Sequence, residues 1–446
     1  MLTAVVTPGA PAVQRLREAA AAESAAQAAK AAAILDLARE VEWNEAAEFD
    51  VVGTRPVRLG ADGTPLVDEH LPLEVAAALG LSVDSAIWLI RDVVNLAARL
   101  PHTWRAVQVG TLPLWRGTDL ARRTEFLALS ECRRVDDAIA AALGTVGWRR
   151  LTHLLRAAMM RVAPARLRAE AERNRADRYI RTGALPDDPS SSYLAGRLDT
   201  ADARGFDELL DRLADALAGS GTVGDHPHLR ARAVGLLADD LGDAARLLSG
   251  APSDPARRRP ARRPHQVYVH LSRAGLSGNS VADVEGLGPV LADQFRCILG
   301  DRPIRVTPVL AVGDPARRVD CYAIPDPIRS EVVLRDRFEA FPHSSRSARS
   351  CDLDHTEPWL EGGPPGQTRA ANLGPLSRRA HRGKTFGGWR LAQPRPGVYW
   401  WTSPRGQVFR VSPRGTWNLT PGGGCSESEQ AIWRHLDRRR AGPPSS

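Results

Sequence analysis

The chain is poor in cysteine and in aromatic residues, and each shortage limits the classes of protein to which it can belong. Cysteine occurs five times in 446 residues, an odd number with no two of them close together. This excludes a disulfide framework and favours a reducing, cytoplasmic setting. The first residues contain no basic start followed by an apolar run, so we expect neither a signal peptide nor a membrane span. No internal repeat is present.

Aromatic residues are also scarce, at 5% of the chain, whereas hydrophobic residues make up 43%. Abundant Ala and Leu favour helices over most of the length. A chain of 446 residues is expected to form two or three domains. The formal net charge of +8 suits a polyanionic partner. A genome-wide preference for Arg would give the same charge, so composition leaves both interpretations open.

Helical patterns fill the first part of the chain. Residues 12–45 contain good helix formers and almost no breakers, and the helical pattern returns over 73–182. Within 190–249, SSYLAGRL is followed by two predicted helices, ADARGFDELLDRLADALAGSG and HLRARAVGLLADDLGDAARLL. Ser82 and Ser130 stand where N-caps are expected. These segments predict a mainly helical N-terminal region.

The composition changes after residue 250. Pro and Arg dominate APSDPARRRPARRPHQ, which predicts a basic linker. QVYVHLS and RVTPVLAV read as strands, VADVEGLGPVLADQFRCIL as a turn and a helix, and GWRLAQPRPGVYWWTSPRGQVFRV as a hairpin. We predict a helical domain, a linker, an α+β segment, a C-terminal domain and a partly disordered tail, at residues 12–250, 251–266, 267–330, 331–411 and 412–446.

A polar constellation begins in CDLDHTEPW, where Asp354 and His355 precede Pro358. The loop EGGPPGQT follows, then Asn372-Leu373, then SRRAHRGK with His381. A polar turn and a capped helix would be the plain structural interpretation. The ordered set of strand, loop, strand and helix with His, Asn and His instead resembles the HNH endonuclease family. The resemblance implies a ββα-metal nuclease domain at 331–411.

The resemblance also implies a role for each residue. His355 is the expected general base that activates water, and Asp354 and His381 are the expected ligands of one divalent cation such as Mg²⁺ or Mn²⁺. Asn372 is expected either to hold the loop or to reach the metal. Phosphate contacts are expected from three basic residues, Arg378, Arg382 and Lys384.

The sequence departs from the family at four positions. HNH proteins of this branch usually bind a structural zinc through C-x-F-P-x-C and L-C-R-R-H-H, whereas this chain has EAFPHS and LSRRAH. We therefore expect no structural zinc, because Glu339, Ser344, Ser377 and Ala380 replace the ligands. Cys351 is expected to be a packed thiol. Aromatic residues are expected to supply the core instead: Trp359, Trp389, Tyr399, Trp400 and Trp401.

Residues 27–325 resemble the mostly helical domain of unknown function that often precedes this motif, chiefly through VADVEGLGPV and YAIPDPIRSEVVLRD. The expected activity is metal-dependent hydrolysis of phosphodiester bonds in DNA, with double-stranded DNA as partner and no membrane. The alternative is a nucleic-acid-binding or interaction protein whose nuclease has decayed. The missing zinc ligands favour the alternative, and the intact catalytic set favours the enzyme.

Overall fold

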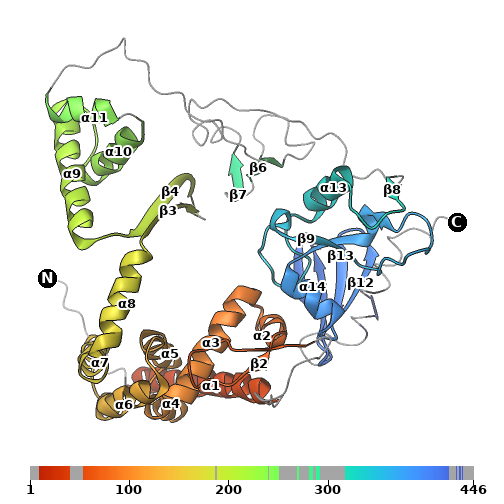
Figure 1. Ribbon diagram of the computed structural model, residues 1–446, viewed down its shortest axis with the longest axis horizontal. Coiled ribbons are helices and arrows are strands. Elements are labelled where there is room, and N and C mark those ends of the chain that lie inside the picture. The colour runs from red at the N-terminus through yellow and green to blue at the C-terminus, as the bar shows by residue number, and fades with distance from the viewer. Residues whose placement is uncertain are drawn as a thin grey trace. The chain divides into compact units, whose positions relative to one another are not determined.

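The computed structural model describes most of the chain, in two compact units (Figure 1). One unit comprises Met1–Leu167 with Val309–Ser446, and the other comprises Arg168–Pro308. The described residues are 10–40, 54–185, 188–239, 241–250, 269–270, 281–284, 288–291, 317–420, 428, 431–432 and 434. The predicted linker 251–266 and the strand RVTPVLAV lie outside them.

The N-terminal part of the first unit is helical. Its helices are α1 (Ala10–Arg39), α2 (Leu71–Leu79), α3 (Val83–Arg99), α4 (Pro101–Gln108), α5 (Leu114–Arg123), α6 (Leu129–Ile139) and α7 (Trp148–Val162), with a short strand pair of β1 (Pro56–Val57) and β2 (Val67–Asp68).

Of the two predicted helix N-caps, one is confirmed and the other is wrong. Ser82 caps α3, because its hydroxyl accepts a hydrogen bond from the Ser85 N–H at 3.2 Å. Ser130 does not cap α6, which begins one residue earlier with Ala128 as N-cap. There the side chain of Glu131 reaches back to the Ala128 N–H at 2.8 Å, so a carboxylate satisfies the helix end in place of the serine hydroxyl.

The apolar faces of α1–α7 form one core. Arg99 of α3 is also buried, at 1% exposure, although it is charged. The Arg99 guanidinium donates to the backbone carbonyls of Glu125 at 3.1 Å and Leu127 at 2.6 Å. A buried cation thereby holds the turn between α5 and α6, since its N–H groups find acceptors there.

The second unit mixes helices with antiparallel strands. A hairpin of β3 (Tyr179–Leu185) and β4 (Asp188–Arg197) follows α8 (Pro164–Ala176). Three helices pack on one another through a small apolar core: α9 (Thr200–Gly219), α10 (His226–Asp239) and α11 (Leu241–Leu248). A three-stranded sheet completes the described part, with β5 (Val269–His270), β6 (Val281–Val284) and β7 (Gly288–Leu291).

The helical prediction fails at two places in this unit. The pattern over 73–182 was predicted to be helical to its end, but the last helix stops at Ala176 and β3 begins at Tyr179. Aromatic and β-branched residues there pair across the hairpin, which outweighs the helical propensity upstream. VADVEGLGPV, predicted as a turn before a helix, forms β6 and β7. The helix predicted after it lies outside the described residues.

The C-terminal part of the first unit contains small antiparallel sheets. After β8 (Arg318–Val319) and α13 (Asp326–Asp336) come β9 (Asp352–His355), β10 (Thr368–Arg369), β11 (Leu373–Leu376) and α14 (Arg378–Thr385). A four-stranded sheet follows, formed by β12 (Arg390–Arg395), β13 (Val398–Thr402), β14 (Val408–Ser412) and β15 (Gly415–Asn418). The predicted hairpin is confirmed, but the sheet extends to Asn418, into the segment predicted as a tail.

The aromatic core of this part is confirmed for Trp389, Tyr399, Trp400 and Trp401, which are all at most 9% exposed. Trp359 is only half-buried. Residues of α2 complete this core: Leu73 and Ala77 pack with the tryptophans of the C-terminal sheet. The helical and C-terminal parts therefore share a packed core, although the predicted boundaries put them in different domains.

The fold class is thus mixed, with a mainly helical N-terminal half and small antiparallel sheets toward the C-terminus. Among the described helices, none is by itself both long and apolar enough to cross a membrane.

Candidate functional site

β9 and α14 lie in the C-terminal part of the first unit (Figure 1), and together with β11 they carry or adjoin the predicted site residues. β9 pairs antiparallel with β11, so that His355 lies opposite Leu373 and Asp354 opposite Gly374. α14 begins directly after β11, with the Ser377 hydroxyl as its N-cap. The first turns of α14 therefore lie beside the end of β9, which places His381 next to Asp354.

Asp354 is the centre of this cluster. Its Oδ1 lies 3.3 Å from His381 Nε2, and its Oδ2 accepts a hydrogen bond from Lys384 Nζ at 2.6 Å. Burial acts to raise the pKa of Asp354, but the hydrogen bonds from His381 and Lys384 outweigh it and lower the pKa. The same hydrogen bond to Asp354 raises the pKa of His381. Asp354 is therefore held as a carboxylate.

His355 is buried, at 5% exposure, and its orientation is fixed by a threonine. Its Nε2 lies 2.8 Å from Thr368 Oγ1, which donates its own hydrogen to the carbonyl of Cys321 at 2.6 Å. Toward His355 the threonine oxygen can therefore only accept, so Nε2 carries the proton and Nδ1 holds the lone pair. Burial lowers the pKa of His355, which keeps the ring neutral.

The exposed ring of Tyr322 stacks on the His355 imidazole, with centroids 5.7 Å apart and planes at 24°. Nδ1 of His355 accepts no hydrogen bond from any of the described residues. The ring is thus held on one edge and on one face, while the nitrogen with the lone pair has no protein partner there.

Asn372 braces the loop after β9. Its Oδ1 accepts from the Thr356 hydroxyl at 2.9 Å and from the Glu357 N–H at 2.8 Å. Its Nδ2 donates to the carbonyls of Glu357 at 3.2 Å and Gln367 at 3.0 Å. The amide has no free lone pair or hydrogen. Of the two predicted roles, the geometry supports holding the loop and not reaching a metal.

The three residues predicted to contact phosphate differ in their partners and exposure. Arg382 donates to the Glu69 carboxylate at 2.6 Å, and Lys384 is bound to Asp354. Arg378 is exposed. Two of the three cations near the site are therefore already neutralised by carboxylates of the same chain.

The four positions that replace zinc ligands lie together and are bonded to one another. Glu339 is 4% exposed, and its two oxygens accept from the Ser344 hydroxyl and the Ser377 N–H, both at 2.7 Å. The Ser377 hydroxyl in turn accepts from the Ala380 N–H at 3.3 Å. A buried carboxylate thus joins the loop at 344 to the N-terminus of α14, where negative charge is favourable.

The Asp354 and His381 side chains fit a divalent cation as a pair. Adjacent ligands of an octahedral ion with bonds of about 2.1 Å lie about 3 Å apart, close to the 3.3 Å between Asp354 Oδ1 and His381 Nε2. Within the described ranges no group of three His, Cys, Asp or Glu side chains converges. Such an ion would complete its shell with water and substrate oxygens, as Mg²⁺ commonly does.

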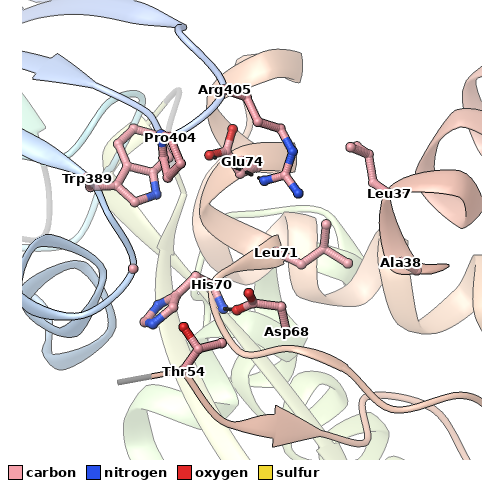
Figure 2. Close-up of a pocket in the computed structure, with 11 residues that line it drawn as sticks. Leu37, Ala38, Thr54, Asp68, His70, Leu71, Glu74, Trp389, Pro404 and Arg405 are labelled. Atoms are coloured by element: carbon pink, nitrogen blue, oxygen red, sulfur yellow. Dashed lines mark hydrogen bonds and ion pairs between the residues drawn. The ribbon is translucent and has the colours of Figure 1, made fainter. Parts of the chain in front are cut away.

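A cavity of about 360 Å³ lies elsewhere in this unit, between α1 and α2 on one side and the loops before β12 and after β13 on the other (Figure 2). His70, Glu74 and Trp389 line it, and each has a buried polar atom without a hydrogen-bond partner in the described part of the chain. Ordered water can satisfy such atoms in a polar cavity of this size. Asp68 and Arg405 also line the cavity. Because both acidic and basic side chains line the cavity, its charge does not favour one class of ligand.

The sequence did not reveal Thr368, Tyr322 or Glu69 as partners of the site. Thr368 contacts a carbonyl 47 positions away in the sequence, and Glu69 lies more than 300 positions before Arg382. No short motif could indicate contacts at such separations.

Comparison with known proteins adds relatives but no activity. The chain is 28% identical over 386 residues to the uncharacterized protein Rv3776 of Mycobacterium tuberculosis, which covers 76% of this chain and 70% of that protein. A stretch of 95 residues is 37% identical to the uncharacterized proteins MT2160 and Rv2100 of the same species, and covers 20% of this chain and 16% of each of them. No protein-family model and no solved structure matches the chain.

Proposed function

We propose that the chain is a metal-dependent endonuclease of the HNH type that hydrolyses phosphodiester bonds of DNA in the cytoplasm. One observation carries the proposal. Asp354 and His355, selected from the sequence by their order alone, lie at the end of β9, and His381 lies on α14. The Asp354 carboxylate and the His381 imidazole are 3.3 Å apart, and the neighbouring His355 is neutral. The order of strand β9, strand β11 and helix α14 along the chain supports this proposal.

The chemistry assigns a role to each group. Nδ1 of His355 takes a proton from a water molecule as the water oxygen attacks phosphorus. The bond from phosphorus to the leaving oxygen breaks, and that oxygen takes a proton from solvent. Asp354 and His381 would hold a divalent cation, which supplies charge stabilisation at the phosphate and the leaving oxygen. Asn372 and Thr368 hold the loop and the base in position.

A second candidate is a DNA-binding protein with an inactive nuclease site. Lys384 favours it, because its ammonium group already neutralises the carboxylate that a cation would need. A lysine there lowers the affinity for a metal by charge repulsion and by competition for Asp354.

Plasmid nicking separates the candidates. We expect wild-type protein with Mg²⁺, Mn²⁺ or Ni²⁺ to nick supercoiled DNA, and His355→Ala to lose at least 100-fold of this rate, the scale of a general base. His226→Ala, at an exposed histidine, is the matched control and should nick at the wild-type rate. Equal nicking by wild type and His355→Ala would mean contamination. Salt-dependent DNA binding without cleavage in any metal would favour the second candidate.

A further inference from the structure

Helix α7 carries exposed basic residues without acidic residues of its own. Its 15 residues hold four arginines and one histidine but no aspartate or glutamate. In contrast, α8 pairs Arg173 and Arg175 with Glu170 and Glu172 one turn away, and α5 pairs Arg123 with Asp119. Arginine-rich composition alone does not explain why acidic partners are present on those helices and missing on α7.

The four arginines lie on the solvent side of the helix. Leu151, Leu155, Ala158 and Met159 fill the buried face. The arginines project from the opposite side in two rows, one formed by Arg149 and Arg156 and the other by Arg150 and Arg161, since residues 7 or 11 apart lie on nearly the same line of a helix. Within the described residues, no carboxylate forms an ion pair with any of the four.

Two tryptophans and a stacked arginine lie at the N-terminal end of α7. Trp148 meets Trp115 edge to face at 5.2 Å, and the Arg116 guanidinium lies 5.1 Å from the Trp115 ring centre and 5.7 Å from the Trp148 ring centre. Trp115 is 54% exposed. An exposed indole with stacked guanidinium beside unpaired arginines is a combination that contacts nucleic acid by stacking and by charge.

We propose that the exposed face of α7, formed by Arg149, Arg150, Arg156 and Arg161, binds the phosphate backbone of DNA. An anionic membrane is the less suitable partner, because an interfacial helix needs a broad apolar face free for lipid. Most of the apolar face of α7 is buried in the core, and only Leu154 and Met160 among its large apolar side chains are exposed. The inference builds on the proposed function by naming where the substrate is held. It requires DNA binding only and stands whether or not the nuclease is active.

The exposed face of α7 offers positive charge that Arg382 and Lys384 at the candidate site do not. Arg382 and Lys384 beside Asp354 are bound to carboxylates of the chain, so they offer a polyanion little uncompensated charge. The arginines of α7 are not neutralised in this way. Each guanidinium that contacts a phosphate releases condensed counterions, which is the main source of sequence-independent affinity.

The test is fluorescence anisotropy with a labelled 20-base-pair duplex, in EDTA to prevent cleavage, over 50–200 mM NaCl. Arg149→Gln, Arg150→Gln, Arg156→Gln and Arg161→Gln are combined in one variant. We expect its affinity at 100 mM NaCl to fall at least ~10-fold, and the slope of log K against log salt to become shallower by about 3 to 4, since each phosphate contact contributes about 0.9.

The matched control removes the same charge from arginines that are already paired. It combines Arg123→Gln, Arg173→Gln, Arg175→Gln and Arg178→Gln, whose partners are Asp119, Glu170, Glu172 and Asp199. Its slope should change by less than about 1. A slope equal to that of the wild type in the folded α7 variant overturns the proposal, as does binding of anionic phosphatidylglycerol vesicles in place of DNA.

Circular dichroism establishes that each variant is folded. If the fourfold variant does not fold, the two rows are tested separately, as Arg149→Gln with Arg156→Gln and as Arg150→Gln with Arg161→Gln. Each row should make the slope shallower by about 2. An unchanged slope in both pairs would equally contradict the proposal. Loss of nicking without loss of binding in a His355→Ala protein bears on the proposed nuclease and leaves the α7 surface unaffected.

Discussion

At the scale of single residues, Thr368 determines which nitrogen of His355 holds the proton. The threonine hydroxyl is fully buried and gives its hydrogen to the Cys321 carbonyl, so it can only accept from His355. A base in the wrong tautomer would present an N–H where a lone pair is needed. Partners that orient a catalytic ligand or base in this way commonly contribute 10- to 100-fold to activity.

Replacing Thr368 by Val therefore tests the position of the base. We expect Thr368→Val to slow nicking about 10- to 100-fold, because valine keeps the volume of threonine but cannot accept from Nε2. Thr368→Ser should stay close to the wild type. The ¹⁵N chemical shifts of the His355 ring should show the Nε2–H tautomer in the wild type and a mixture in Thr368→Val. An unchanged tautomer in Thr368→Val would contradict the role of Thr368.

The cysteines differ in exposure in a way that the sequence predicted only in part. Cys351 is buried as expected, and burial together with the nearby Glu339 carboxylate raises its thiol pKa to about 12. Cys132 is also buried, whereas Cys321 is exposed and its carbonyl accepts from Thr368. The stretch that carries the site therefore has a cysteine that is inert at neutral pH, and the site uses another cysteine through its backbone alone.

At the scale of elements, Glu339 joins the loop after α13 to the start of α14. Its carboxylate accepts from the Ser344 hydroxyl and the Ser377 N–H while almost fully buried. Hydrogen bonds to a charged acceptor each contribute about 1.5 to 3 kcal/mol. The carboxylate connects three of the four positions at which the resemblance leads one to expect zinc ligands.

We therefore expect Glu339→Ala to lower the free energy of unfolding by about 2 to 4 kcal/mol, since two buried donors lose their acceptor. Glu339→Gln should cost about half as much, because its one carbonyl oxygen can still accept from Ser377. Urea denaturation followed by tryptophan fluorescence measures both. Full stability in Glu339→Ala, or tightly bound zinc in metal analysis of the wild type, would show that something other than this carboxylate holds the loop.

Local signals were enough to find the candidate site. The order Asp354, His355, Asn372, His381 led to residues on neighbouring strands and a helix within 30 positions, of which Asp354 and His381 are in contact. The hairpin of β12 and β13 and most of the N-terminal helices were also predictable from period and composition. The β3–β4 hairpin was missed because its strands follow a long run of helix formers, and the pairing of Tyr179 with Arg197 is decided across the hairpin.

At the scale of the whole molecule, α2 links the helical part to the C-terminal part. Seven of its nine residues are buried, which is unusual for a helix near a surface. Leu71, Val75 and Ala76 belong to the helical core, and Leu73 and Ala77 to the core of the C-terminal sheet. Sequence periodicity shows that α2 is apolar all round, which indicates burial. It cannot show that the partner of one face is nearly 300 positions away.

A shared helix should make the two parts unfold together. We expect Leu73→Ala to lower the free energy of unfolding by about 2 to 5 kcal/mol, because Leu73 is fully buried against Trp389 and Trp401. Helical circular dichroism and tryptophan fluorescence should report one transition at the same urea concentration, shifted by the same amount. Leu79→Ala, on the same helix but 37% exposed, should cost below about 1 kcal/mol. If Leu73→Ala moves the fluorescence transition and leaves the helical one in place, the two parts are independent domains, and the predicted boundary at 331 would be the better description of the C-terminal part.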